Sequence, residues 1–294
     1  GGLLAAALGN ALPEVRAAAA RALGCTRREE ARDALVAAKG ASEPRVRRAV
    51  AAGLGEFAGD ESAAIALAGW LRAGEPSVFV EAELALALGR TRSPLALDLL
   101  PPLALRPSFQ ALVGSRAIEG LGRTGDERAF ALIRAAWRPE APFPARRAVV
   151  AALAELARGT GLARAAREAI EERLRDADFR VRLEAAVALG RLGLTDALPA
   201  IRAALAGELD GRTKRRMKDA IRDIEDSARP AEEARRLQDE VERLRGETAK
   251  LRERLDRLEI RLVAPAPVAP TPAAKIKRPR PVTRRSRGAR PVRR

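Results

Sequence analysis

The sequence contains no histidine, no tyrosine and only one cysteine, Cys25, among its 294 residues. Without histidine, this chain cannot build Ser-His-Asp or Cys-His catalytic groups, histidine-ligated zinc sites or ordinary imidazole acid–base chemistry. A single cysteine forms no internal disulfide, which favours a reducing compartment, and we expect a cytoplasmic protein. The carboxylates match no calcium-binding loop, so we expect neither a metal nor a cofactor.

Aromatic residues are scarce, at 3% of the chain, although 47% of the residues are hydrophobic. Alanine and leucine must therefore fill most of the core, which suits closely packed helices better than a strand-rich fold. No run of about 18 uncharged apolar residues exists, so we expect no membrane span. The apolar start, residues 3–8, lacks the basic leader of a signal peptide. It resembles the end of an earlier helix, and since residue 1 is not Met we expect a piece of a longer protein.

One sequence pattern recurs along the chain: Val-Arg, an alanine-rich run, then Leu-Gly. It occupies residues 15–24, 46–55 and 181–190. Weaker copies end at Gly89, Gly122 and, with alanine in the glycine place, Ala154. Successive ends are 31, 34, 33, 32 and 36 residues apart, and a period of this size is typical of a stacked-repeat solenoid.

Each copy of this pattern is followed by a short loop and a second amphipathic stretch, so each repeat is predicted to hold two helices. We expect the repeat glycine to end its helix in a left-handed conformation. Capping boxes beginning at Thr26 and Thr124 mark helix starts, and Pro13, Pro44 and Pro144 mark others. The second stretches are residues 29–38, 61–71, 95–105, 126–137, 162–174 and 196–206.

These paired helices, with a Pro-x-Val-Arg opening and a Leu-Gly close, resemble HEAT repeats, in particular the short bacterial type also seen in phycobilisome lyase subunits. The resemblance covers residues 1–227 and implies a curved right-handed superhelix with protein-binding faces. The pattern departs at Glu81, Gly114 and Arg146-Arg147, where we expect irregular curvature. The predicted fold is thus an all-α, HEAT-like α-α superhelical solenoid over residues 1–228, capped by a polar helix at 211–224.

Pro230 is predicted to open a separate helix, a coiled coil over residues 229–262. Leucine occupies every d position, and the three predicted g–e′ pairs of a parallel dimer all have opposite charges. The alternative is an amphipathic helix that folds back on its own solenoid. The predicted dimer seam is Leu237, Val241, Leu244, Leu251, Leu255 and Leu258, with Thr248 and Leu262 also at a positions.

Residues 263–294 are predicted to be a disordered proline- and alanine-rich linker followed by a basic tail. The last twenty residues carry ten of the positive charges behind the net charge of +16, with no acidic residue after Glu259. Such a tail could bind nucleic-acid phosphates without sequence preference, or serve only as a solubilising tail. The candidate phosphate-binding residues are Lys275, Lys277, Arg278, Arg280, Arg284, Arg285 and Arg287.

Three further features invite a functional interpretation. The G-x-G-x-x-G pattern at 120–125 follows a predicted helix where a dinucleotide site needs a strand, so we do not expect nucleotide binding. Trp70 and Trp137 are single aromatics, expected to be packing residues. Recurring arginines could line a face that meets phosphates or an acidic partner, or form a structural ladder that bonds adjacent repeats, as nearby Asp176 and Asp178 suggest. These arginines are Arg16, Arg47 and Arg182, with neighbours Arg45, Arg48 and Arg180.

Residues 179–262, with the segment Glu-Leu-Asp-Gly-Arg at 208–212 and the leucine heptads, are similar to the C-terminal part of bacterial aminopeptidase N-like zinc peptidases. That resemblance implies a non-catalytic piece that would shape a peptide cavity. The family's H-E-x-x-H zinc motif and G-x-M-E-N segment are both missing here, so no family site residue can be carried over.

We therefore predict a non-catalytic protein-interaction scaffold, the C-terminal part of a larger protein such as a zinc metallo-aminopeptidase. Pairing of two copies through the coiled coil would raise its effective concentration. The alternative is a nucleic-acid-associated scaffold that binds phosphates through its tail. A lyase-like reaction on a chromophore is the remotest hypothesis, because histidine and tyrosine are missing.

Overall fold

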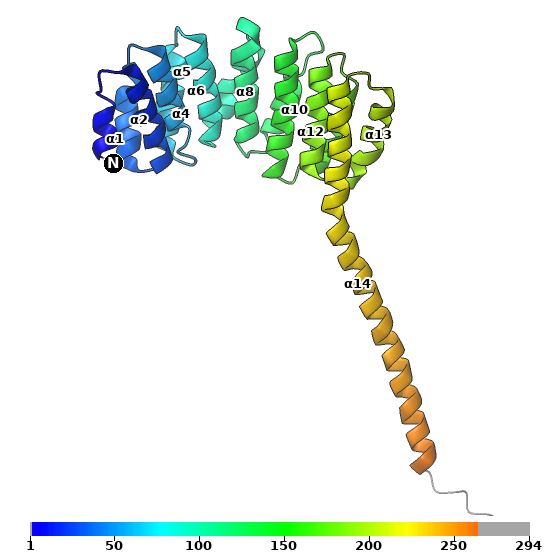
Figure 1. The fold of residues 1–294 in the computed structure, drawn as a ribbon. Coiled ribbons are helices and arrows are strands. Elements are labelled where there is room, and N and C mark those ends of the chain that lie inside the picture. The colour runs from blue at the N-terminus through cyan, green and yellow to red at the C-terminus, as the bar shows by residue number, and fades with distance from the viewer. Residues whose placement is uncertain (1, 264–294) are drawn as a thin grey trace, which may run out of the picture. The chain divides into compact units, whose positions relative to one another are not determined.

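A computed structural model describes residues 2–263, and every regular element within them is helical. The chain divides into two units, Gly1–Ala234 and Arg235–Arg294. In the first unit two layers of helices alternate along the chain (Figure 1). The odd-numbered layer holds α1 (Gly2–Ala7), α3 (Glu29–Ala37), α5 (Glu61–Ala73), α7 (Leu95–Leu105), α9 (Ala129–Ala135), α11 (Ala163–Glu171) and α13 (Leu198–Gly207). The even-numbered layer holds α2 (Pro13–Thr26), α4 (Pro44–Leu54), α6 (Val78–Arg90), α8 (Leu112–Arg123), α10 (Phe143–Arg158), α12 (Phe179–Leu192) and the start of α14 (Gly211–Val263).

The repeated leucines make the core, as the period predicts. The leucine before each repeat end is at most 1% exposed, and the odd-numbered helix of each repeat adds an equally buried aliphatic residue to the same core. Each repeat thus buries two large side chains, each worth about 2 kcal/mol of hydrophobic free energy. The even-layer members are Leu23, Leu54, Leu88, Leu121, Leu153 and Leu189, and the odd-layer members are Leu35, Leu67, Leu100, Ile133, Ile170 and Ile201. The predicted all-α, HEAT-like solenoid is confirmed.

The repeat glycines do not end helices in a left-handed conformation, so that prediction was wrong. Among the described residues, the glycines with positive φ are Gly59, Gly74, Gly125 and Gly193. The repeat glycines instead let neighbouring even helices touch. A Cβ on Gly24 would lie 2.6 Å from the Gly53 Cα of α4, and one on Gly89 would overlap the Gly120 carbonyl of α8.

These close approaches set the curvature. Even helices pack against one another extensively, whereas successive odd helices barely meet. The more tightly spaced layer must lie on the inside of the curve, so the even helices form the inner layer and the odd helices the outer layer.

The predicted helix starts were partly right. Pro13 and Pro44 begin α2 and α4, and Pro144 lies in the first turn of α10. The two capping boxes were wrong, because the hydroxyls of Thr26 and Thr124 donate to carbonyls of the preceding turn. Short 3-10 segments, η1 (Ala38–Gly40), η2 (Phe109–Ala111), η3 (Glu172–Arg175) and η4 (Thr195–Ala197), link several helices.

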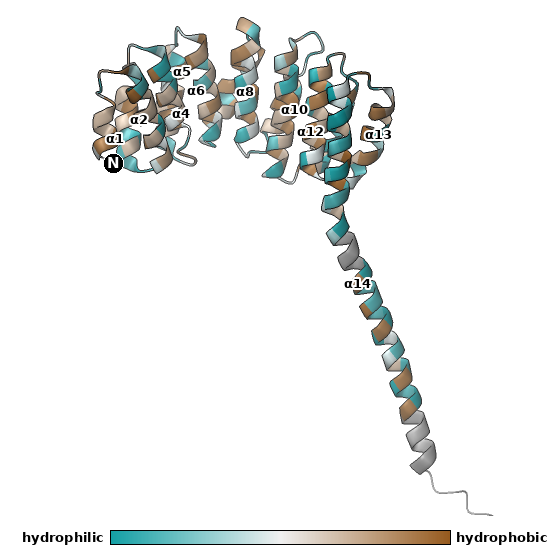
Figure 2. Cartoon of the chain, in the orientation of Figure 1, coloured by the Kyte–Doolittle hydropathy of each residue, from teal (hydrophilic) through white to brown (hydrophobic). Residues whose placement is uncertain are grey.

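The predicted break at Pro230 is absent, since α14 runs through it from Gly211 to Val263. Pro230 costs the helix one backbone hydrogen bond but does not end it. Apolar residues recur among hydrophilic ones along α14 (Figure 2). None of the helices within residues 2–263 is long and apolar enough to cross a membrane. The basic-tail residues Lys275 to Arg294 lie outside the described residues.

Candidate interaction surface of the inner layer

The recurring arginines form a structural ladder between repeats. Arg47 is hydrogen-bonded to both carboxylate oxygens of Glu75, at 2.7 and 3.1 Å, and Arg182 to both of Glu208, at 2.7 and 2.8 Å. Arg16 lies 2.5 Å from Glu43. Each of the three also donates to two carbonyls of the turn before its own helix. Of the two interpretations of these arginines, the structural one is confirmed.

The ladder continues at Glu81 and Arg146, two of the three places where the sequence departs from the pattern, but not at Gly114, which has no side chain to pair. Ladder residues lie eight positions before the repeat ends at 24, 55, 154 and 190, which places Arg146 in the series beside Arg16, Arg47 and Arg182. Arg146 is 3.1 Å from Asp176. Eight positions before Gly89 the charges are exchanged, because Glu81 pairs with Arg106. The constant spacing of eight is the signal that would have found both pairs.

Hydrogen bonds make these ion pairs strong in spite of their burial. The Glu208 side chain is 1% exposed. Hydrogen bonds from Arg182 outweigh the effect of burial and, with the Asp210 and Leu209 N–H groups, lower the pKa of Glu208 to about 2. Burial raises the pKa of Glu75, but hydrogen bonds from Arg47 and the Ser77 N–H more than reverse that effect and leave the pKa lowered. Arginines so fully satisfied are not free to bind a partner.

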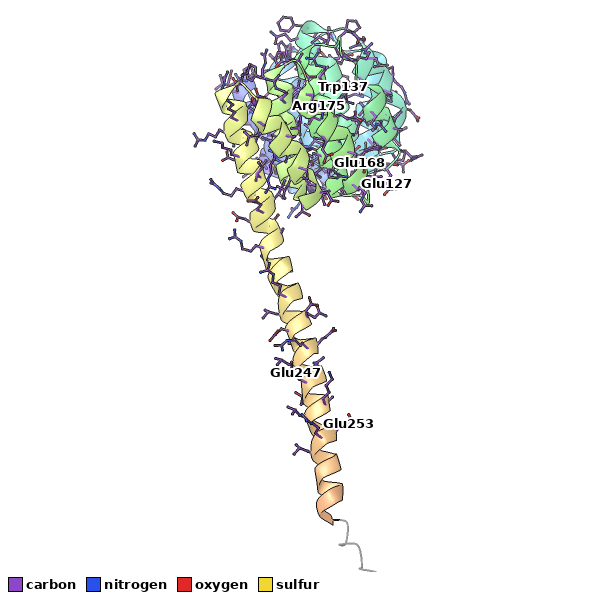
Figure 3. The ribbon with its side chains drawn as sticks, turned by 90° about the vertical axis from the view of Figure 1, so that its right-hand side faces the viewer. Glu127, Trp137, Glu168, Arg175, Glu247 and Glu253 are labelled. Atoms are coloured by element: carbon purple, nitrogen blue, oxygen red, sulfur yellow. The ribbon has the colours of Figure 1, made fainter. Side chains whose placement is uncertain are left out.

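The neighbouring arginines and the tryptophans are also accounted for locally. Arg45 pairs with Glu14, Arg48 with Glu83 and Arg180 with Asp178. Trp70 is 8% exposed and its Nε1 donates to Glu75. The guanidinium of Arg173 stacks 3.9 Å from the ring centre of Trp137, which lies in the upper part of this unit in Figure 3. Both tryptophans are packing residues, as predicted.

The guanidinium groups of a second set of arginines are not saturated with hydrogen bonds as those of the ladder are. Most of this set gathers around the C-terminal ends of α2, α6, α8, α10 and α12, where the helix dipoles favour positive charge. Two adjoining hollows, of about 580 and 360 Å³, share Arg90, Arg123 and Glu155. We call their charged lining the arginine surface: Arg27, Arg90, Arg92, Arg116, Arg123, Arg158 and Arg191, with Glu56, Glu119 and Glu155.

On the arginine surface the arginines outnumber the carboxylates, and two of the carboxylates each pair with two arginines. Glu56 contacts both Arg27 and Arg90, and Glu155 contacts both Arg123 and Arg158. Arg92 and Arg191 form no ion pair with any described residue. Seven arginines against three glutamates leave a local excess of four positive charges. The arrangement can hold carboxylates or other anions by charge-assisted hydrogen bonds.

Acidic side chains line a different hollow, of about 630 Å³, between η3 and α13. Its carboxylates are engaged already, since Glu171, Asp176 and Glu208 pair with arginines of the solenoid. Within residues 2–263 no group of three or more possible ligands is placed to hold a metal ion. The arginine surface is therefore the better candidate site, and sequence reasoning missed it.

Comparison with known proteins agrees with this architecture. A family model described as HEAT repeats matches residues 2–86, and one described as PBS lyase HEAT-like repeat matches residues 181–207. The chain carries HEAT repeats. No curated protein matches it.

Three solved structures match at low identity. Human deoxyhypusine hydroxylase, in complex with glycerol, is 21% identical, with 76% of this chain and 84% of that chain covered and a TM-score of 0.35. The complex of CpcE and CpcF of phycocyanin lyase from Nostoc sp. PCC7120 is 22% identical, with coverage of 76% and 94% and a TM-score of 0.45. An engineered protein is 18% identical, with coverage of 76% and 96% and a TM-score of 0.33. At such scores none of the three bears on the function of these HEAT repeats, and none is an aminopeptidase.

Proposed function

We propose that this chain is a non-catalytic protein-interaction scaffold whose arginine surface binds an acidic segment of a protein partner. The observation that carries the proposal is the excess of seven arginines over three glutamates around two connected hollows of the inner layer. Arg92 and Arg191, which form no ion pair within 4 Å with any described residue, offer their guanidinium groups directly.

The lining favours an acidic protein segment over a nucleic acid. Glu56, Glu119 and Glu155 interrupt the positive charge, and would repel a continuous phosphate backbone. No aromatic side chain lines these two hollows for base stacking. A peptide with spaced carboxylates can meet the arginines and avoid the glutamates.

The test is a selection of random 16-residue peptides displayed on phage against the full chain. We expect the selected peptides to be rich in aspartate and glutamate. The double variant Arg92→Gln/Arg191→Gln should bind them about tenfold more weakly at low salt, since each exposed charge contributes up to about 1 kcal/mol. The control, Arg72→Gln/Arg164→Gln, removes two exposed arginines of the outer layer and should change nothing. Selected peptides without acidic character, or equal loss in the control, would contradict the proposal.

Nucleic-acid binding through the tail is the alternative, and it has its own test. A duplex titrated at low salt should bind the full chain and a chain lacking residues 275–294 equally if the tail is only solubilising. Loss of binding on deletion would establish the tail as a phosphate-binding segment.

We also propose that two copies pair through the coiled coil of α14. The described seam residues are exposed: Leu237 by 63%, Leu244 by 47% and Leu251 by 60%. An apolar stripe that repeats every seven residues on a charged helix is the feature that a parallel dimer would bury. The a-position residues of the seam, Val241 and Leu255, are exposed as well, whereas the Leu258 side chain is not among those that the structure describes.

The zinc aminopeptidase parent remains a hypothesis that rests on the sequence resemblance alone. The coding sequence upstream of Gly1 decides it: an H-E-x-x-H motif there would support the hypothesis, and a contiguous run of further repeats would contradict it.

A further inference from the structure

Four of the six phenylalanines recur at the N-terminal ends of successive inner helices. Phe79 lies at the start of α6 and Phe109 in η2 just before α8, while Phe143 and Phe179 are the first residues of α10 and α12. This edge is opposite to the helix ends that carry most of the arginine surface.

Two of these rings are already covered by the chain itself. The Arg180 guanidinium lies 3.6 Å from the ring centre of Phe143 and 5.3 Å from that of Phe179, and Arg212 lies 4.9 Å from Phe179. No cation of the described residues stacks on Phe79 or Phe109, and these side chains are 57% and 65% exposed. An exposed pair of large aromatic side chains is the feature of a contact surface that is not yet covered.

Between the two bare rings lies a hollow of about 240 Å³, which we call the aromatic hollow. Leu112 and Pro144 add apolar lining beside the rings. Ser115 lines it too, 8% exposed and with a hydroxyl that has no hydrogen-bond partner. The remaining lining residues are Gln110, Arg116, Glu119 and Arg147.

The backbone at this place is held in an uncommon conformation. Gln110 has a φ of 49° and Ala111 a φ of 55°, so two consecutive residues with a Cβ adopt the left-handed region. Such residues cost on the order of 1 kcal/mol or more each, and they cluster at binding sites. Here the two residues form the turn that follows Phe109, whose ring stays largely exposed.

The aromatic hollow shares Arg116 and Glu119 with the arginine surface. We propose that it is the anchor site for apolar side chains of the acidic segment, so that one partner peptide places leucine or a residue of similar size against Phe79 and Phe109 and its carboxylates against the arginines. This inference rests on the proposed function. The hollow is smaller than the pockets of about 300 to 1,000 Å³ that hold drug-sized molecules, which suits one or two side chains. Two arginines, Arg116 and Arg147, line it against one glutamate, Glu119, and this balance favours an acidic flank over a basic one.

Two synthetic peptides test the inference: one has two leucines flanked on each side by four glutamates, and the other has alanines in place of the leucines. Binding of the alanine peptide to the full chain measures charge alone. We expect the leucine peptide to bind about tenfold more tightly, and that difference to vanish in the double variant Phe79→Ala/Phe109→Ala. The control Leu12→Ala/Ile65→Ala removes apolar side chains that are 60% and 56% exposed elsewhere, and should keep the difference.

The outcomes separate the two proposals. If both peptides bind equally and Arg92→Gln/Arg191→Gln weakens both, the aromatic hollow is no anchor site but the arginine surface still binds acidic segments. If neither peptide binds at low salt, both proposals fail. If a single-stranded oligothymidine binds and only its binding is lost in Phe79→Ala/Phe109→Ala, the rings stack on bases and the peptide inference is overturned.

Discussion

The ion pair of Arg182 and Glu208 gives the sharpest quantitative prediction. The pKa of Glu208 falls from its ordinary value of 4.5 to about 2 in the folded chain, chiefly because Arg182 donates two hydrogen bonds to it. A carboxylate whose pKa is lower in the folded than in the unfolded chain stabilises the fold above pH 4.5 and loses that contribution as the pH falls toward 2. The difference corresponds to about 3 kcal/mol at neutral pH, of which about 2 kcal/mol should be lost between pH 5 and pH 3.

The perturbation is Glu208→Gln, which keeps the shape of the side chain but cannot ionise. At pH 7 we expect it to lower the free energy of unfolding by about 3 kcal/mol, because Arg182 keeps its charge beside a neutral, almost fully buried partner. Urea unfolding followed by circular dichroism at 222 nm, at several pH values, measures the difference between wild type and variant. That difference should shrink by about 2 kcal/mol from pH 5 to pH 3.

Glu225→Gln is the matched control. Glu225 pairs with Arg202 at 2.6 Å, but the two side chains are 45% and 58% exposed. Such a pair contributes under about 1 kcal/mol, so the control should differ little from wild type at every pH. A difference between wild type and Glu208→Gln that stays constant from pH 5 to pH 3 would refute the account of the ladder.

Two further predictions concern packing and assembly. Gly89→Ala should destabilise the solenoid by at least about 2 kcal/mol in urea unfolding, because the new Cβ would overlap the Gly120 carbonyl. The control Gly69→Ala places its Cβ in open space on α5 and should stabilise the solenoid by up to about 1 kcal/mol. Equal effects of the two substitutions would contradict the packing role of the repeat glycines. At a chain concentration of tens of micromolar, light scattering should show a dimer for the wild type and a monomer for the double variant Leu244→Glu/Leu251→Glu. A wild type that is monomeric at this concentration would refute the coiled coil.

The sequence was sufficient for the fold because each repeat is a local unit. Leu23 and Leu54 are buried for the same reason in each repeat, so their spacing alone predicts the core. The role of the glycine could not be predicted in the same way, because Leu-Gly fits both a helix end and a close helix contact. The two differ only in what lies opposite, and the residue opposite Gly24 is Gly53, in the next repeat.

The sequence predicted that arginines would join adjacent repeats, but it did not predict which acidic residues they would pair with. Asp176 seemed a neighbour for Arg182, yet its carboxylate pairs with Arg146, while Arg182 reaches forward to Glu208. Local spacing finds acidic residues near in sequence, whereas a solenoid joins residues about thirty positions apart. The arginine surface was missed because no single repeat shows it. The signal appears only when the residues after the repeat ends are compared, which are Cys25 and then Glu56, Arg90, Arg123, Glu155 and Arg191.

The position of an arginine within the repeat decides what it does. Eight residues before the repeat end, Arg47 and Arg182 are 14% and 20% exposed, and each saturates one carboxylate with two hydrogen bonds. One residue after the end, Arg123 is 53% exposed and shares Glu155 with Arg158. Two guanidinium groups on one carboxylate leave a whole positive charge at the surface, and arginine occupies the same position in two other repeats, as Arg90 and Arg191. The same period that joins the repeats through buried arginines therefore also produces the row of exposed ones from which an acidic partner would be bound.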